Sequence, residues 1–327
     1  MNIIFTLDYE LFLGENTGTV DNCLIRPMTL LTSNNSIRYT IFVDAVYLYK
    51  LNSYKDKYPT LHHDLNKICQ HLKLLQSSGH DIQLHIHPHW YFSIYDGNRW
   101  VLDNEHYKLS DVPFETVSVI FKESKTFLDN LLGKKTTIFR AGGFSSQPTS
   151  LLVSLFEENG IICDSSVCPG MYYSSSHQKY NYISTPAKDL WHFKNDICKE
   201  DRCNDSILEV PISTYHLSPV FWWKYVITKL LKPVNHKLYG DGKSVKTNTE
   251  SIKERLFKKS MGLATIDGYK ISYFMDIYRK YKNDGHNYLC IIGHPKLSTP
   301  YSIERLKSIV DEMKRNGDMF LTISEII

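Results

Sequence analysis

The sequence lacks several features that would assign it to particular protein classes. No apolar run approaches the ~20 residues that a membrane-spanning helix needs. The chain begins directly with the apolar segment 3–7, without the basic stretch, apolar run and cleavage site of a secretory signal. The formal net charge is only +3, from 38 basic and 35 acidic residues, and no dense stripe of lysine or arginine is present. This charge pattern argues against nucleic acid as a partner.

Cysteine is sparse and irregularly spaced. Seven cysteines, an odd number without a regular framework, indicate reduced thiols. Cys198 and Cys203 lie in a charged loop and could pair or bind a metal, although chance spacing is the simpler interpretation. Together with the missing export signal, this cysteine usage predicts a cytoplasmic protein.

The first half of the chain alternates between strand-like and helix-like spacing. Apolar runs at 3–7, 38–43, 137–140 and 161–163, and the run that leads into residue 85, are typical of buried strands. Helical spacing at 61–77, 114–132 and 148–158 separates these runs. This alternation predicts an α/β fold of parallel strands with helices outside.

The second half is less regular. Segment 171–206 predicts loops or a small hairpin, and 234–260 a loop, while the remaining elements are strands at 207–212, 288–292 and 320–322 and helices at 219–232, 269–283 and 302–316. Without an internal repeat or a clear linker, we expect one domain over 1–327 with a loop-rich insertion around 171–260.

Three histidines, His85, His87 and His89, fall at the end of a predicted strand. On a strand His85 and His87 point to the same side, and Pro88 should end the strand so that His89 lies on the following loop. Imidazole is the commonest protein ligand of transition metals, and two imidazoles with one carboxylate form a familiar zinc site. A surface turn that happens to be rich in histidine is the alternative.

Polar side chains also follow other predicted strands. Each has an ordinary structural explanation by itself, such as a helix cap or a surface charge. The carboxyl ends of parallel strands, however, meet at one edge of a sheet, which is where α/β folds place their chemistry. The candidates at these ends are Asp8, Glu10, Asp44, Arg140, Asp164 and His294.

The order and spacing of these residues resemble the polysaccharide deacetylases of the NodB-homology group, carbohydrate esterase family 4. The resemblance runs nearly from end to end, through segments 5–10, 40–43, 79–82, 85–89, 140–144, 164–166 and 291–294. It implies a distorted (β/α) barrel with about seven parallel strands. It also implies a metal-dependent carbohydrate deacetylase that hydrolyses a linear amide C–N bond.

Two segments depart from the family pattern. Many members have two adjacent aspartates where this chain has Asp8-Tyr9-Glu10, and Tyr9 is a poor substitute for a metal-binding carboxylate. Glu10 lies on the same side as Asp8 if the segment stays extended. Segment 141–144, directly after Arg140, has Ala-Gly-Gly-Phe where family members usually have Pro-Pro-Tyr-Gly. This difference affects the contacts with substrate more than the catalytic steps.

The resemblance implies a metal site and a base. Asp8 is the expected base and Glu10 the expected ligand, although the reverse is also open. His85 and His89 complete the expected ligand set, with His87 as a substitute for His89. The cation is predicted to be zinc, with iron, cobalt or nickel as alternatives that suit the same ligands.

The remaining roles follow from what amide hydrolysis requires. Arg140 is expected to hold Asp8 ionised and aimed, and Asp164 to orient an acid or the arginine. His294 is the expected acid that protonates the leaving amine. A backbone N–H near Gly143 or Phe144 is expected to stabilise the oxyanion, and Trp90 is a further predicted substrate contact.

These residues predict removal of an N-acetyl or O-acetyl group from a sugar. Because no export signal is present, the expected substrate is a nucleotide-linked or lipid-linked precursor of a surface polysaccharide. One alternative is an amidohydrolase of the same fold that acts on a small non-sugar amide or formamide. Another is a carbohydrate-binding protein whose catalytic site has decayed.

Segment 219–232 combines apolar and basic residues. That composition is typical of an interfacial helix in peripheral contact with a membrane, which would suit a lipid carrier. A core-facing helix with snorkelling lysines is the commoner explanation.

Overall fold

The computed structural model describes residues 1–33, 37–203, 206–245 and 253–327. These residues group into two compact units, each built from two stretches of chain. Unit 1 contains Met1–Tyr39 and Ile212–Leu321, and unit 2 contains Thr40–Pro211 and Thr322–Ile327. The expectation of one domain with an insertion around 171–260 stays a prediction, and residues 204–205 and 246–252 of that insertion lie outside the described part.

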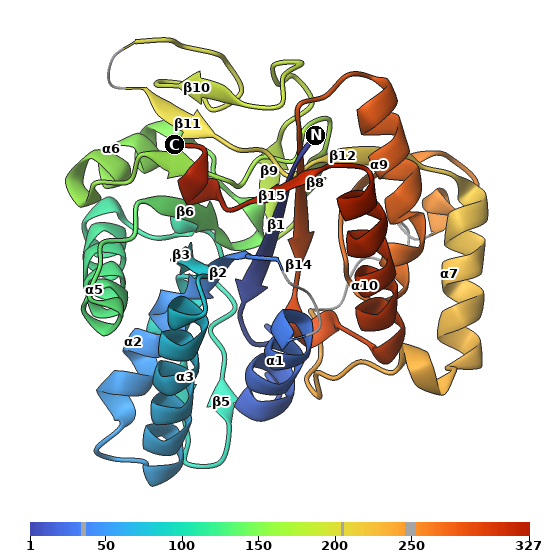
Figure 1. Cartoon of the computed structure of the whole chain (residues 1–327). Coiled ribbons are helices and arrows are strands. Elements are labelled where there is room, and N and C mark those ends of the chain that lie inside the picture. The colour runs from blue at the N-terminus through green and yellow to red at the C-terminus, as the bar shows by residue number, and fades with distance from the viewer. Residues whose placement is uncertain (34–36, 204–205, 246–252) are drawn as a thin grey trace. The chain divides into compact units, whose positions relative to one another are not determined.

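Unit 1 is organised around its first strand. Strand β1 (Asn2–Tyr9) pairs in parallel with β14 (Tyr288–Gly293) and with β15 (Met319–Leu321). Figure 1 shows the blue β1 beside β14, although nearly the whole chain separates them in sequence. The run of buried apolar residues in β1 is typical of a parallel strand that is covered on both faces.

Helices and a two-stranded antiparallel sheet complete unit 1. The helices are α1 (Arg26–Ser33), α7 (Pro219–Leu231), α9 (Phe274–Asn283) and α10 (Pro300–Arg315), and the small sheet pairs β12 (Thr214–Leu217) with β13 (Ser260–Leu263). Helix α10 begins where the sequence favours it, because Thr299 and Ser302 form a capping box and Pro300 occupies the first turn.

Unit 2 contains five parallel strands in the order β2–β3–β6–β7–β11, with β10 antiparallel at the end. The strands are β2 (Thr40–Asp44), β3 (Asp81–Ile86), β6 (Ile138–Ala141), β7 (Cys163–Asp164), β11 (Ile207–Glu209) and β10 (Trp191–Phe193). Helices α2 (Ala45–Tyr54), α3 (Pro59–Ser77), α5 (Phe114–Leu132) and α6 (Thr149–Asn159) lie between them in the chain. The predicted strand–helix alternation is therefore confirmed.

Short elements of unit 2 lie in the segments without clear periodicity. They are α4 (His89–Phe92), the hairpin β4 (Ile94–Tyr95) with β5 (Trp100–Val101), and the hairpin β8 (Tyr172–Ser174) with β9 (Lys179–Asn181). The last hairpin confirms the prediction for 171–206. None of the helices in the described residues is both long and apolar enough to span a bilayer.

Two helices have no counterpart in the sequence prediction. Helix α2 buries Ala45, Val46, Tyr47 and Leu48 in succession, so it shows no amphipathic spacing. Helix α1 follows a π-helical turn (Asp21–Ile25) and carries Pro27, a residue that normally counts against a helix. Both are cases in which tertiary packing overrides the local signal.

Candidate active site

In unit 1 the ends of two parallel strands bring a histidine to two carboxylates. The register sets Leu7 opposite Gly293, so Asp8 and His294 follow at neighbouring strand ends. His294 Nε2 lies 3.7 Å from Asp8 Oδ2 and 3.8 Å from Glu10 Oε1. Because both carboxylates approach the same nitrogen, Asp8 and Glu10 project to one side, as the extended segment predicted.

A third carboxylate holds the other side of His294. Asp267 Oδ2 lies 2.9 Å from His294 Nδ1, and Asp267 Oδ1 accepts a 2.8 Å hydrogen bond from the His294 backbone N–H. Burial acts to lower the pKa of His294, but Asp267, Asp8 and Glu10 together raise it above the ordinary value. The ring is therefore oriented by Asp267 and presents Nε2 to Asp8 and Glu10.

Lys296 neutralises Glu10 inside the protein. Its Nζ donates a 2.8 Å hydrogen bond to Glu10 Oε1 and a 2.6 Å bond to the carbonyl oxygen of Leu11. Both charged side chains are buried. A buried carboxylate is stabilised by a hydrogen-bonded ammonium group of opposite charge. The sequence analysis singled out neither Lys296 nor Asp267, since a lysine or an aspartate in a polar segment carries no distinctive signal.

In unit 2 the register aligns Asp44 with His85 and His85 with Arg140. His85 Nδ1 lies 2.8 Å from the carbonyl oxygen of Arg140, so Nδ1 carries the proton and donates it. A neutral imidazole held in this way presents the lone pair of Nε2, the arrangement common among metal-binding histidines.

The other two histidines differ in their surroundings. The His87 ring is perpendicular to that of His85, with centroids 4.7 Å apart. The His89 ring lies 5.6 Å from His87 and stacks on Tyr107 at 4.7 Å. All three histidines are buried. Strand β3 ends at Ile86, before Pro88, as predicted, but His89 is the first residue of α4 and does not lie on a loop as expected.

Arg140 is fully buried and held by several groups. Its Nε donates to the carbonyl oxygen of Ser165 at 2.8 Å, and an Nη donates to Ser165 Oγ at 2.9 Å. Its guanidinium carbon lies 4.0 Å from the centroid of the Phe42 ring. These contacts fix the plane of the guanidinium, so its orientation is set before any ligand arrives.

Asp164 belongs to a buried carboxyl pair. Its two oxygens accept hydrogen bonds from the Ser166 N–H and hydroxyl, at 3.1 and 2.8 Å. Burial raises the pKa of Asp164, although hydrogen bonds with Glu209 and Ser166 and the charge of Arg140 act to lower it. The strand register places Glu209 opposite Asp164, so two buried carboxyl groups lie side by side at this end of the sheet. The sequence analysis missed Glu209, which lies inside a predicted strand.

The Ala-Gly-Gly-Phe segment forms a tight turn after β6. Gly143 and Phe144 both adopt positive φ angles of 59°. The Phe144 carbonyl oxygen accepts a 2.6 Å hydrogen bond from the Tyr182 hydroxyl, which holds a conformation that side-chain-bearing residues rarely adopt. By contrast, Trp90 is fully buried and packs against Tyr47 and Trp100. This placement favours a packing role for Trp90 over the predicted substrate contact.

Because Gly142 has no side chain, the His87 ring can lie directly beside its backbone. A Cβ at this position would lie 2.6 Å from His87 Nδ1 and 2.6 Å from the carbonyl oxygen of Ile86. We therefore expect Gly142→Ala to displace the His87 ring, to cost about 1–3 kcal/mol of stability, and to lower the amount of bound metal. Thermal unfolding and metal analysis of the purified variant would measure both effects.

Gly133→Ala is the matched control for this substitution. Gly133 has a φ of 65°, but no atom lies within 4 Å of an added Cβ. The control should lose some stability through backbone strain and bind metal normally. Equal metal content in both variants would show that the space beside His87 is not needed for metal binding.

Each unit by itself carries buried groups of a type that divalent transition metals select. Unit 1 has the carboxylate of Glu10, and unit 2 has the imidazoles of His85, His87 and His89. The hydrogen bond from His85 Nδ1 supplies the outer-shell support that metal-binding histidines usually have.

Comparisons with known proteins support the fold. The chain is similar to a Mycobacterium smegmatis protein assigned as a polysaccharide deacetylase (TM-score 0.50, 13% identity, covering 99% of this chain and 88% of that chain). It is also similar to the allantoinase PuuE (TM-score 0.52, 13% identity, 99% and 88%). A third similar structure is the 4-alpha-glucanotransferase of Thermococcus litoralis (TM-score 0.50, 15% identity, 99% and 38%).

At these identities the likeness concerns the fold alone. It confirms the predicted class, a (β/α) barrel of the type found in NodB-like deacetylases. No protein-family model matches the chain, and no curated protein matches it by sequence.

Proposed function

We propose that this chain is a metal-dependent hydrolase that removes an acetyl group from an N-acetylated, or O-acetylated, sugar. The observation that carries the proposal is the setting of His294 in unit 1, between Asp267 and the carboxylates of Asp8 and Glu10. An imidazole that is oriented from one side and presented to carboxylates on the other is suited to acid–base chemistry.

The proposed metal ligands are Glu10, His85 and a second histidine. Two rings that bind one ion at ~2.1 Å have centroids about 5 Å apart. The 4.7 Å between the ring centroids of His85 and His87 is compatible with His87 as the second ligand. A divalent cation, with zinc preferred over iron, cobalt or nickel, supplies Lewis acidity that lowers the pKa of water from ~15.7 toward ~7.

The protein's own groups move the protons. Asp8 takes the proton of the attacking water, and Arg140 is the proposed residue that holds Asp8 aimed at that water. His294 donates a proton from Nε2 to the leaving amine, which cannot depart as an anion. A backbone N–H of Gly143 or Phe144 donates to the oxyanion as the carbonyl becomes tetrahedral. Asp164, through its charge interaction with Arg140, helps to fix the guanidinium.

Asp267 is the proposed positioning residue for His294. We expect Asp267→Asn to lower kcat by about 10²-fold, because the amide no longer holds the proton on Nδ1 and favours the wrong tautomer. KM and the metal content should stay near their original values, which a merely structural defect would not allow. Steady-state kinetics and metal analysis would measure these quantities. Asp276→Asn, on the exposed side of α9, is the matched control.

Metal analysis and product analysis test the proposal as a whole. The purified chain should contain a divalent cation and release acetate from N-acetylated sugars, and a chelator should abolish that release. A chain without metal that releases no acetate would favour the carbohydrate-binding alternative.

A second candidate is an amidohydrolase that acts on a small non-sugar amide. The fold likeness to the allantoinase PuuE favours it. Release of product from allantoin or a formamide, with N-acetylated sugars untouched, would decide for this candidate. The cytoplasmic location of the protein stays a prediction from its cysteine usage, and linkage of the sugar to a nucleotide or lipid is a further proposal.

A further inference from the structure

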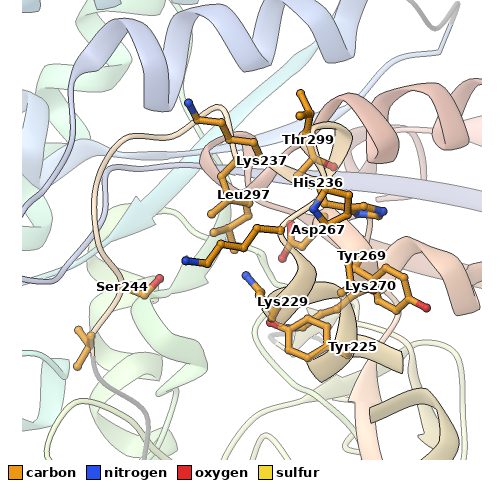
Figure 2. A pocket seen from close by; sticks show the side chains of 17 residues that line it. Tyr225, Lys229, His236, Lys237, Ser244, Asp267, Tyr269, Lys270, Leu297 and Thr299 are labelled. Carbon is orange, nitrogen blue, oxygen red and sulfur yellow. The ribbon is translucent and has the colours of Figure 1, made fainter. Parts of the chain in front are cut away.

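A cavity of about 920 Å³ is lined entirely by residues of unit 1. Asp267 is the one residue that it shares with the candidate active site described above. It is lined by α7, by the segment that follows α7 and by residues near Asp267 and Leu297. Figure 2 shows Asp267 in the middle of the labelled lining, with Lys229, Lys237 and Lys270 around it. Asp267 therefore belongs both to this cavity and to the setting of His294.

The lining carries an excess of positive charge. Four lysines, Lys229, Lys232, Lys237 and Lys270, contribute to it, and Asp267 is its one carboxylate. Asp267 is already paired with His294. Among the residues that the structure describes, none of the four lysines makes an ion pair with a carboxylate. Among the described lining residues, four lysines therefore face a single carboxylate.

The charges are close enough to influence one another. Burial lowers the pKa of Lys270, and the nearby charges of Arg255 and Lys229 lower it further against the opposing effect of Asp267. Because desolvation and the neighbouring cations disfavour the charged form of Lys270, an anion bound beside it would stabilise that charge. Phosphate is the anion that lysine clusters commonly bind, as point charges around its oxygens.

The outer face of α7, beside this cavity, is apolar and exposed. Trp223, Ile227, Leu230 and Leu231 follow one another at helical spacing and are 47%, 49%, 75% and 75% exposed. Within α7 only Trp222 is buried. The core-facing interpretation of segment 219–232 therefore fails to account for most of its apolar side chains. An exposed apolar stripe of this kind marks an interaction site.

We propose that the cavity binds the phosphate of a lipid-linked sugar, and that the exposed face of α7 contacts the lipid. This proposal rests on the proposed function. The sugar attached to the phosphate would react at His294, and Asp267 both contacts His294 and lines the cavity. A soluble nucleotide would also satisfy the lysines, but it would leave the apolar stripe of α7 without a ligand. Lys224 and Lys229 on the same helix, and Lys232 directly after it, suit an anionic lipid surface.

Vesicle binding tests the cationic part of the proposal. The intact chain should float with phosphatidylcholine vesicles that contain phosphatidic acid, a lipid monophosphate, and not with pure phosphatidylcholine. Lys229→Gln and Lys270→Gln should each weaken this binding by about fivefold. Lys307→Gln, an exposed lysine on α10 outside the cavity, is the matched control and should bind normally. Unchanged binding by both cavity variants would overturn the proposal.

A second pair of variants tests the lipid part. Leu230→Ser and Leu231→Ser change exposed side chains, so the fold should tolerate them. They should reduce flotation with phosphatidic acid vesicles and leave binding of inorganic pyrophosphate unchanged. Flotation equal to that of the original chain, or binding of a nucleoside diphosphate that exceeds binding to the vesicles, would overturn the assignment to a lipid.

The two proposals fail in different ways. His294→Gln should float with the vesicles like the original chain, because His294 does not line the cavity. Vesicle binding without any acetate release would therefore refute the hydrolase and keep the lipid phosphate site. Acetate release from N-acetylated sugars, with no difference between the lysine variants and Lys307→Gln in flotation, would keep the hydrolase and refute the lipid phosphate site.

Discussion

Replacing His294 by glutamine should lower the turnover of an N-acetylated sugar by about 10²–10⁴-fold. Glutamine keeps a polar side chain of similar length but cannot donate a proton to the leaving amine as an acid. Metal content should stay unchanged, since the proposed ligands are Glu10 and the histidines of unit 2. Acetate release at saturating substrate and metal analysis of the same sample would measure the two quantities.

The control for this experiment is a histidine that lies away from the proposed chemistry. His216 is exposed on β12 in the same unit, so His216→Gln should turn over like the original chain. If His294→Gln retained full turnover, His294 would not be the acid. If the variant lost its metal as well as its activity, His294 would have to be counted among the groups that hold the ion.

Replacing His85 by alanine should abolish both metal binding and activity. The loss of metal affinity should exceed the 10–100-fold that removal of an outer-shell partner costs, because His85 is a proposed ligand. The substitution also removes the hydrogen bond to the Arg140 carbonyl. Metal titration of the purified variant, with circular dichroism to follow folding, would measure the effect.

Two further variants make this result specific. His63→Ala, at an exposed position of α3 in unit 2, should leave metal binding unchanged. His87→Ala and His89→Ala should differ, with the larger loss of metal at His87 if that residue is the second ligand. A folded His85→Ala variant that still bound the metal tightly would remove His85 from the site.

Much of the fold was predictable because its signals are local. Helix α5 was predicted over the residues that it occupies, since its apolar positions keep helical spacing and Gly133 ends it with a φ of 65°. Strands β1, β3 and β14 were predictable because short apolar runs end in polar residues there. Helix α2 was not, because burial of every residue in its first turn removes the periodicity on which such predictions depend.

Some residues of the candidate site were predictable from the sequence and others were not. A cluster of histidines, or a polar residue directly after an apolar strand, is a recognisable sequence pattern, so Asp8, Glu10, His85 and His294 could be named in advance. Asp267, Lys296 and Glu209 could not. Each is an ordinary polar residue whose importance depends on its partner, and nothing in its own surroundings in the sequence points to that partner.

The amino-acid sequence by itself determined the order of strands and helices and the chemical groups that follow the strands, since periodicity and residue type act within a few neighbours. Only the tertiary structure decided which groups meet. Asp267 and His294 are 27 residues apart and Glu10 and Lys296 are 286 apart, yet the side chains of each pair lie within hydrogen-bond distance. Such contacts depend on how parallel strands register and on how buried charges find a partner, and neither leaves a local trace in the chain.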